Sequence, residues 1–410
     1  MKKFSWILIL LAVGALLSCP NPASSPAKPW VVSTIAGTGT AGYNAQDTDG
    51  LAARFNRPEG VAVDAAGNVY VADRDNNRIR KLAPNAEKTS YTVSTIAGDG
   101  TAGHRDGPGI EPDPDTDPDT DTGAQFNQPT GVAVDSSGNL YVADRSNHRI
   151  RKLTKSESGG NVTYAVSTIP GDGTTAQFNK PTGVAVDAAG NVYVADTENH
   201  RIRKLTKSES GGNVTYTVDT IAGSDQGSIH YGTADGQGTS AQFYKPRGMA
   251  VDAAGNVYVA DTNNHLIRKL TETESGGIVR YTVDTIAGSS TPGHRDGRGT
   301  SAQFNKPYGV AVDAAGNLYV ADTENRRIRM LTKSGSGESA RYTVSTIAGP
   351  VSTVCNTGRT KNECPSGYVD STGSAARFSL VYDVATDSAG KNLYVADAIS
   401  NHRIRKIVHP

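Results

Sequence analysis

The sequence has no excess of charge of either sign. Its 410 residues include 41 Lys and Arg and 41 Asp and Glu, so the formal net charge at pH 7 is zero. A protein that binds nucleic acid through its phosphates carries a strong positive field, which a charge-balanced chain does not supply. The composition therefore argues against nucleic acid as a partner.

Cysteine is scarce, with three residues in the chain, and the first of them ends the N-terminal segment. Lys2 and Lys3 precede an apolar run at 4–17, which is short for a membrane span. The run ends in Leu-Leu-Ser and Cys19, and it is similar to the signal of bacterial lipoproteins, which implies lipid on Cys19 after cleavage. An ordinary secretory signal with an incidental cysteine is the alternative. A lipid would anchor the chain to the cell envelope, at the outer membrane or cell surface rather than the inner membrane.

What the sequence has in abundance is one repeated segment. Its clearest copy is GVAVDAAGNVYVADTENHRIRKL at 183–205, and six copies occur along the chain. Two apolar runs flank a Gly-Asn turn, and a polar turn then leads to a run in which charged and apolar residues alternate. A further strand such as 216–222 follows after a variable loop. Four short strands per unit predict the blades of a β-propeller. The Val of the VAD core recurs at Val71, Val142, Val194, Val259, Val320 and Val395.

This pattern resembles the NHL repeat family, whose units read roughly as Pro-x-Gly-Val-Ala-Val-Asp, a Gly-Asn turn, Tyr-Val-Ala-Asp and Asn-His-Arg-Ile-Arg. The resemblance implies an all-β, six-bladed propeller over residues 31–410, preceded by a signal peptide at 1–19 and a Pro- and Ser-rich tether at 20–30. It implies much less about activity, because the fold hosts binding scaffolds and unrelated enzymes. We interpret the basic RIRK strands as solvated outer strands that symmetry spreads around the ring.

The two ends of the repeat region complement each other. Residues 31–37 copy a fourth strand but stand before any first strand, whereas the sixth unit stops at its third strand near the C-terminus. We expect residues 31–36 to pair with this last strand and close the ring, which removes open sheet edges. The sixth unit also departs from the pattern, with Asp383 in place of Gly and Lys391 inserted in its turn.

Aromatic residues are few but regularly placed. Six of the seven Phe stand shortly before a first strand, and a Tyr recurs in each second strand. We interpret the Phe as wedges between adjacent blades and the Tyr as core residues. The Phe are Phe55, Phe126, Phe178, Phe243, Phe304 and Phe378, and the Tyr are Tyr70, Tyr141, Tyr193, Tyr258, Tyr319 and Tyr394. An Asp also precedes each of these Phe, which we interpret as turn chemistry: Asp49, Asp121, Asp172, Asp235, Asp296 and Asp370.

Two patterns raise the question of metal binding. Four histidines share one turn position, but strands about 4.8 Å apart place it roughly 10 Å or more from the axis, too far for ligands that must lie about 2 Å from one Zn²⁺. We interpret them as turn residues: His148, His200, His265 and His402. The acidic run Asp113–Asp121 fits a calcium loop poorly, because Thr122 and Gln128 stand where Gly and Glu are needed. We predict a disordered loop there, with weak Ca²⁺ association as the alternative, and no cofactor.

The loops that lead into the first strands differ from blade to blade, from 6 to 28 residues. They share one face of the ring with the turns that carry the histidines, and we call it the loop face. The longest loop contains Cys355 and Cys364, which we expect to form a disulfide in an exported protein. Free thiols or a metal pair are the alternatives. Loops on a rigid scaffold are where function usually lies.

The residue before the first-strand Gly also varies, and it should lie at the mouth of the central channel. There the radius is small enough for six side chains to meet around one ligand, although an unremarkable polar rim is the alternative. These predicted binding residues are Glu59, Thr130, Thr182, Arg247, Tyr308 and Tyr382.

We predict an exported scaffold that binds a protein or glycan partner on its loop face, without catalysis. The alternative is an enzyme, such as a lyase or a lactonase-like hydrolase, at the channel mouth around Glu59, Arg247, Tyr308 and Tyr382. Some six-bladed relatives hold a catalytic metal, but this ring has no His and a single carboxylate, so that metal centre does not transfer. A structural spacer is a third possibility.

Overall fold

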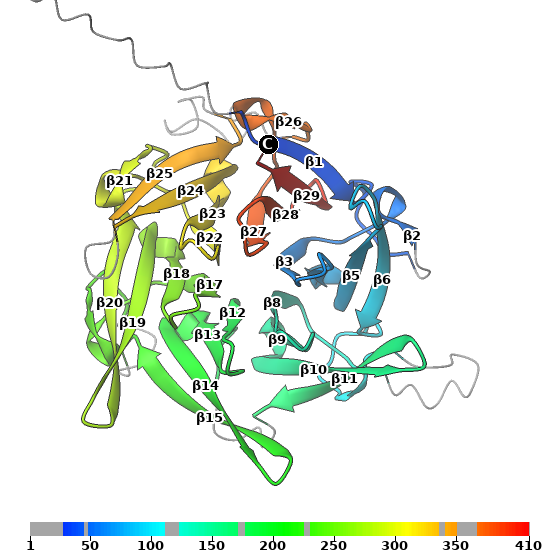
Figure 1. Cartoon of the computed structure of the whole chain (residues 1–410), viewed down its shortest axis with the longest axis horizontal. Helices are drawn as coiled ribbons and strands as arrows, with labels where there is room; N and C mark the ends of the chain where they lie inside the picture. The colour runs from blue at the N-terminus through cyan, green and yellow to red at the C-terminus, as the bar shows by residue number, and fades with distance from the viewer. Residues whose placement is uncertain are drawn as a thin grey trace, which may run out of the picture.

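Six antiparallel sheets surround a central axis in the computed structural model of the chain (Figure 1). The structure describes residues 28–44, 48–110, 123–170, 177–224, 230–335, 341–350 and 367–409. The predicted all-β, six-bladed propeller is therefore confirmed. Cys19, Asp113–Asp121, Cys355 and Cys364 lie outside the described residues. In the part of the chain that is described, no helix has the length and apolar character needed to cross a bilayer.

Each blade runs from an inner strand at the axis to an outer strand at the rim. The inner strands are β3 (Pro58–Val63), β8 (Pro129–Val134), β12 (Val184–Val186), β17 (Pro246–Val251), β22 (Pro307–Val312) and β27 (Val381–Thr386). The second strands are β4 (Val69–Asp73), β9 (Leu140–Asp144), β13 (Val192–Asp196), β18 (Val257–Asp261), β23 (Leu318–Asp322) and β28 (Asn392–Asp397). We number the blades 1 to 6 in this order.

The third and outer strands complete the blades. The third strands are β5 (Arg78–Pro84), β10 (Arg149–Ser158), β14 (Arg201–Ser210), β19 (Leu266–Ser275), β24 (Arg327–Ser334) and β29 (Arg403–Val408). The outer strands are β6 (Tyr91–Ala97), β11 (Asn161–Ile169), β15 (Asn213–Ala222), β20 (Ile278–Gly288), β25 (Arg341–Ala348) and β1 (Val31–Ala36). Five sheets gain a two-residue edge strand: β2 (Thr48–Asp49), β7 (Gly107–Pro108), β16 (Gly236–Gln237), β21 (Gly297–Arg298) and β26 (Ser371–Thr372).

The ring closes as the sequence predicts. Strand β1 pairs antiparallel with β29, so that Val31 lies opposite Val408 and Thr34 opposite Arg405. The N-terminal strand thus becomes the outer strand of blade 6, beside the C-terminal strand in Figure 1. The backbone hydrogen bonds between β1 and β29 thus join the N-terminal and C-terminal ends of the domain and close the ring.

The aromatic residues pack where they were expected. Phe55 is fully buried in a cluster that joins Ile35 and Ile404 of blade 6 to Val71 of blade 1. It therefore forms a wedge between two blades, as predicted. The second-strand Tyr70 is also buried, and its hydroxyl donates a hydrogen bond to Asp64 at the end of β3. Hydrophobic area of this kind, repeated at every seam, supplies most of the stabilisation of the ring.

A buried ion pair lies beneath each wedge, and it corrects one interpretation. In blade 5 the guanidinium of Arg329 donates to Asp322 at 2.7 Å and to Asp296 at 2.6 Å, and it lies 5.1 Å from the ring centroid of Phe304. Arg329 is fully buried, so the interpretation of the third strands as solvated is wrong for this position. Burial is tolerated because carboxylates and backbone carbonyls accept hydrogen bonds from the two terminal Nη groups of the guanidinium. The equivalent arginines of the other blades are Arg80, Arg151, Arg203, Arg268 and Arg405.

The Asp residues before the Phe wedges also have a different role from the one expected. Asp235, Asp296 and Asp370 each pair with the buried arginine of their blade at 2.6 to 2.7 Å, instead of forming simple turns. In blade 2 this partner is Asp106, which stands in the same His-Arg-Asp-Gly sequence as Asp296. Asp49 does act as a turn residue, since it accepts a hydrogen bond from the Leu51 amide. Asp121 and Asp172 lie outside the described residues.

The four histidines occupy the turn position that was predicted, and they join the blades. The turn of blade 4, η6 (Thr262–Asn264), ends at His265 in the left-handed conformation with φ 60°. Its Nδ1 accepts a hydrogen bond from the amide of Lys306 in blade 5 at 3.0 Å. His148, His200 and His402 make the same bond to the next blade. Each histidine is therefore a link between blades.

The connections opposite the loop face are hairpins rather than loops. Strands β10 and β11 stay paired as far as Ser158 and Asn161, and a Gly-Gly turn at 159–160 with φ of 59° and 83° joins them. β14 and β15, and β19 and β20, extend in the same way. The TKSESGG segments at 154–160 and 206–212 thus continue the ladder, because positive φ at two successive glycines suits a tight hairpin turn.

Candidate functional site

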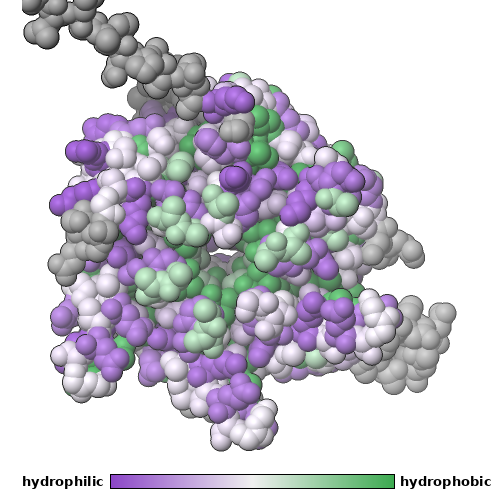
Figure 2. Space-filling view, viewed as in Figure 1, coloured by the Kyte–Doolittle hydropathy of each residue, from purple (hydrophilic) through white to green (hydrophobic). Residues whose placement is uncertain are grey.

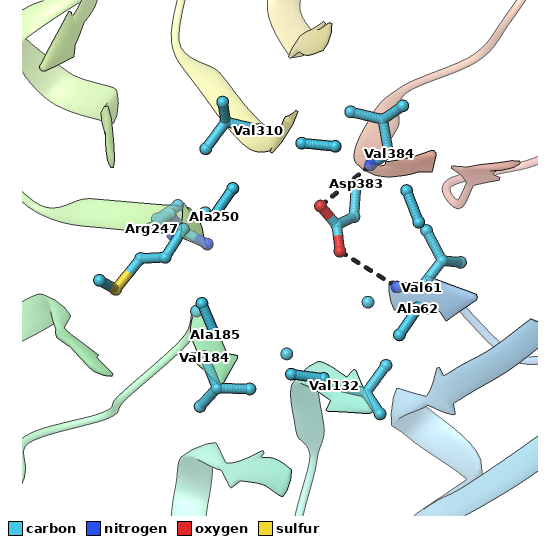
Figure 3. A pocket seen from close by; sticks show the side chains of 18 of the residues that line it. Val61, Ala62, Val132, Val184, Ala185, Arg247, Ala250, Val310, Asp383 and Val384 are labelled. Atoms are coloured by element: carbon cyan, nitrogen blue, oxygen red, sulfur yellow. Dashed lines mark hydrogen bonds between the residues drawn. The ribbon is translucent and has the colours of Figure 1, made fainter. Parts of the chain in front are cut away.

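The six inner strands enclose a central cavity of about 230 Å³. Its wall is built mainly from the Val and Ala residues of these strands, and hydrophobic residues gather around the central opening in Figure 2. Figure 3 shows several of them, such as Val132 and Val310, arranged around the channel. Every blade contributes to the lining, so a ligand on the axis could contact all six.

Close approach between the blades fixes the mouth of this channel. A Cβ on Gly183 would clash with the carbonyl oxygen of Arg247 in the next blade, and one on Gly60 would clash with that of Thr130. Glycine is therefore required at these positions so that the inner strands can converge. The residue before each glycine is held at the narrow rim, and all six predicted binding residues line the one cavity.

Four of these six residues form one cluster. The carboxylate of Glu59 lies 3.7 Å from the guanidinium of Arg247, and that guanidinium lies over the ring of Tyr308 at 4.3 Å. The rings of Tyr308 and Tyr382 meet edge to face with centroids 5.1 Å apart. Side chains from blades 1, 4, 5 and 6 thus make contact across the mouth. The sequence predicted their positions at the rim but not which of them would touch.

The two threonines are placed differently. Thr130 is buried, and its hydroxyl donates to the Thr182 carbonyl at 3.1 Å. The hydroxyl of Thr182 lies 2.6 Å from that of Thr197. Both threonines therefore bond within the wall between blades, and the structure does not bring their hydroxyls into the charged cluster.

Three arginines that sequence reasoning did not single out complete the mouth. Arg74 lies 3.3 Å from the Glu59 carboxylate and donates to Gln128 at 3.1 Å. Arg57 donates to the Tyr382 hydroxyl at 3.2 Å. Burial lowers the pKa of Arg145, and the positive charges of Arg74 and Arg247 lower it further, whereas Glu59 and Glu198 raise it.

A signal for two of them was present in the sequence. Arg74 and Arg145 directly follow the second-strand Asp in blades 1 and 2. Blades 3, 4 and 5 have Thr there and blade 6 has Ala398. The threonines are structural, since Thr262 donates to the Pro307 carbonyl of the next blade at 2.7 Å. The two arginines are therefore departures from a repeat position that has a structural role elsewhere.

Asp383 is the other departure, and it faces the channel below the mouth. Its carboxylate accepts hydrogen bonds from the amides of Val61 at 3.1 Å and Val384 at 2.9 Å (Figure 3). It thereby joins blade 6 to blade 1, at the place where other blades have the channel glycine. Burial raises the pKa of Asp383 to about 7, although the two amide hydrogen bonds act in the opposite direction.

An aromatic group lies on the loop face, between blades 3 and 4. The rings of Tyr231 and Tyr244 stack with centroids 4.2 Å apart, and His200 meets both edge to face. Half of the Tyr231 surface is exposed. Lys245, next to Tyr244, pairs with Glu198 at 2.9 Å. Over the described residues, no group of three His, Cys, Asp or Glu side chains is close enough to hold a metal ion.

The fold and its channel define the class: a six-bladed β-propeller with a charged and aromatic channel mouth. The family model described as NHL repeat matches the chain five times, and each match begins at a Phe wedge and covers the inner, second and third strands or most of them. The chain therefore belongs to the NHL repeat family. The matched segments are 55–82, 126–153, 178–205, 243–270 and 304–329.

Curated relatives share the repeats within longer proteins. The chain is 30% identical over 313 residues to NHL repeat-containing protein 2 of Homo sapiens, over 68% of this chain and 39% of that protein. It is 29% identical over 323 residues to Protein SUPPRESSOR OF QUENCHING 1, chloroplastic, of Arabidopsis thaliana, over 76% of this chain and 28% of that protein. The chain thus spans less than half the length of these relatives.

Solved structures resemble the fold across nearly the whole chain. A protein of unknown function from Bacteroides thetaiotaomicron has a TM-score of 0.60 at 20% identity, over 92% of this chain and 76% of that one. An auxiliary nutrient binding protein from the same species has a TM-score of 0.59 at 18% identity, with the same coverage. At such identities the likeness establishes the fold alone.

Proposed function

We propose that this protein is a binding scaffold that takes a protein or glycan ligand at the loop face, with the channel mouth as the centre of the site. The observation that carries the proposal is asymmetry at one position of a symmetric ring. Glu59, Arg247, Tyr308 and Tyr382 come from equivalent places in different blades, yet they meet as one cluster above one cavity. Arginine and tyrosine are typical binding hot spots.

The rest of the repeat has structural roles that leave this position free to vary. The buried arginines pair with Asp, the Phe residues fill the seams, and the histidines join the blades. The residue before the first-strand Gly position varies among the blades, so no single side chain is needed there for these contacts. The name of the auxiliary nutrient binding protein, which has the same fold, also supports a binding role.

An enzyme at the same mouth is less well supported. The carboxylates of Glu59 at the mouth and of Asp383 below it already have partners, since Arg74 and Arg247 flank Glu59, and two backbone amides donate to Asp383. A general base needs a lone pair directed at the substrate. Metal analysis of the purified protein separates the two ideas, because a stoichiometric channel metal would favour the enzyme.

We further propose that the chain is exported and held at the cell envelope by lipid on Cys19, away from nucleic acid. The basic start, the short apolar run and the Ser-Cys ending support this. Detergent-phase partitioning tests it. Cys19→Ala should move the protein to the aqueous phase, and a variant that still enters the detergent phase would contradict lipidation.

The binding proposal is tested by capture from envelope extract with the immobilised full chain, followed by measurement of affinity for the captured partner. Arg247→Ala combined with Tyr308→Ala should weaken binding at least about tenfold, equivalent to about 1.4 kcal/mol. The matched control is Arg280→Ala combined with Val279→Ala, since both residues are exposed on the β20 hairpin of the opposite face. If the control pair weakens binding and the mouth pair does not, the site lies on the other face.

A further inference from the structure

Arg145 stands apart from the other arginines of the channel mouth. Arg74 and Arg247 share the Glu59 carboxylate, and Arg57 donates to Tyr382. The Arg145 side chain is half-buried, yet it has no hydrogen-bond or ion-pair partner anywhere in the described parts of the chain. A guanidinium has five donors, and leaving them unpaired while water is partly removed is costly.

The charge around Arg145 is also unbalanced. Four guanidinium groups gather at the mouth, and two carboxylates, Glu59 and Asp75, lie against them. The nearby Glu198 and Lys245 neutralise each other. The chain as a whole has no net charge, so this local positive excess is a feature of the mouth. A partly enclosed site of one sign attracts ligands of the opposite sign.

We propose that the mouth recognises an oxyanion, a carboxylate or phosphate group of a small ligand, and that Arg145 is its main contact. The inference rests on the proposed function and adds the chemistry of the ligand. The planar guanidinium fork of Arg145 can bind such a group through two parallel hydrogen bonds. Arg145 holds in blade 2 the position that Arg74 holds in blade 1, where Arg74 and Arg247 meet at the Glu59 carboxylate, and these two arginines would share the negative charge. An acidic sugar satisfies this chemistry and also the glycan option.

The repeat itself supplies a variant that should preserve the fold. Thr occupies the position of Arg145 in three other blades, and in two of them, at Thr197 and Thr262, it donates to the Pro carbonyl of the next blade. Arg145→Thr should therefore fold normally. Without ligand its melting temperature should equal or exceed that of the parent protein, because a repulsive charge has been removed.

Binding is measured by calorimetry on the full chain with three probes: inorganic phosphate, glucuronate and neutral glucose. We expect phosphate or glucuronate to bind and glucose not to bind. Arg145→Thr should weaken anion binding about tenfold, as expected for the loss of a charged hydrogen bond. Arg145→Lys, which keeps the charge but loses the fork, should lie between the two. Arg280→Thr, the same exchange on the opposite face, should leave affinity unchanged.

The pattern of anion binding distinguishes the possible ligands. Binding of phosphate with no binding of glucuronate would support a phosphate ligand, and the reverse would support an acidic sugar. No anion binding, or equal affinity of Arg145→Thr and the parent, would overturn the proposal. A large drop in the melting temperature of Arg145→Thr would also overturn it, since Arg145 would then be structural. If anions fail to bind but the captured partner still depends on Arg247 and Tyr308, the oxyanion inference fails and the scaffold stands.

Discussion

Arginine has opposite roles in two regions of this molecule. Inside the blades, Arg329 is fully buried, and its terminal Nη groups donate to Asp322, Asp296 and backbone carbonyls. At the channel mouth, Arg74 and Arg247 share one carboxylate and Arg145 has none among the described residues. The blade arginine recurs in every unit, whereas the mouth arginines do not. A charge that is repeated and satisfied holds the fold, and a charge that is unrepeated and unsatisfied is available to a ligand.

We expect the largest loss of stability when the ring is opened. Deleting residues 31–36 removes the outer strand of blade 6 and exposes the edge of β29. We expect aggregation or a fall in melting temperature of 10 °C or more, roughly, because every blade depends on its neighbours. Deleting 20–27 of the tether serves as the control and should change little. Equal stability of the two truncations, measured by scanning calorimetry, would argue against closure.

The next largest effect should come from a blade arginine. Arg329→Ala leaves the fully buried carboxylate of Asp322 without its ion-pair partner, and we expect a loss of about 3 to 5 kcal/mol in the free energy of unfolding. Urea denaturation measures it. Arg145→Thr is the comparison at the mouth and should cost nothing. If the two substitutions are equally destabilising, the distinction between the two regions disappears.

The fold could be predicted from the sequence because the apolar strand patterns and the turn residues between them repeat six times and indicate the same strands. The burial of Arg329 could not be predicted, because a third strand with alternating charge reads the same whether its arginine faces water or an Asp in the core. The special role of Arg145 could not be predicted for a related reason. Arg and Thr are both ordinary turn residues, and the structural bond of Thr262 to Pro307 had to be seen before an Arg in its place looked exceptional.

The candidate site was predicted in its positions but not in its contacts. The close approach of Gly183 to the next blade explains why the preceding residue lies at the rim. Which side chains then meet depends on the direction in which each one leaves the rim. Thr130 and Thr182 turn into the wall, whereas Tyr308 and Tyr382 turn toward each other. The repeat pattern gives the position of each residue but not the direction of its side chain.

Asp383 differs from both groups of arginines, because it occurs in one blade only and yet has hydrogen-bond partners. Its pKa is raised to about 7 by burial, against roughly 3.9 in an unfolded chain. Between these values the folded protein holds a proton that the unfolded chain has lost, so this group contributes stability at low pH that disappears as pH rises through 7. We expect the melting temperature of the parent to fall relative to that of Asp383→Asn between pH 4 and pH 7. The opposite trend would mean that the amides of Val61 and Val384 outweigh burial and keep the carboxylate ionised.

The smallest expected effect concerns the histidines, which are repeated and satisfied but titratable. His265 and His402 each accept a backbone hydrogen bond on Nδ1, from Lys306 and Arg57, so this nitrogen must be unprotonated. Burial lowers the pKa of both, and a neighbouring cation, Lys306 or Arg403, lowers it further, although Asp75 opposes the shift at His402.

The consequence is a loss of stability in mild acid. A His whose folded pKa lies below the unfolded value of about 6.5 contributes its full stabilisation above that pH, and the contribution is lost as pH falls through and below it. Asn77 makes the same bond in blade 1, to the amide of Gln128 at 2.9 Å, without titrating in this range. The double variant His265→Asn, His402→Asn should therefore match the parent at pH 7.5 and melt roughly 1 to 2 °C higher than the parent at pH 5.5. If the two proteins have parallel melting curves across this range, the histidine links are not a source of the acid sensitivity.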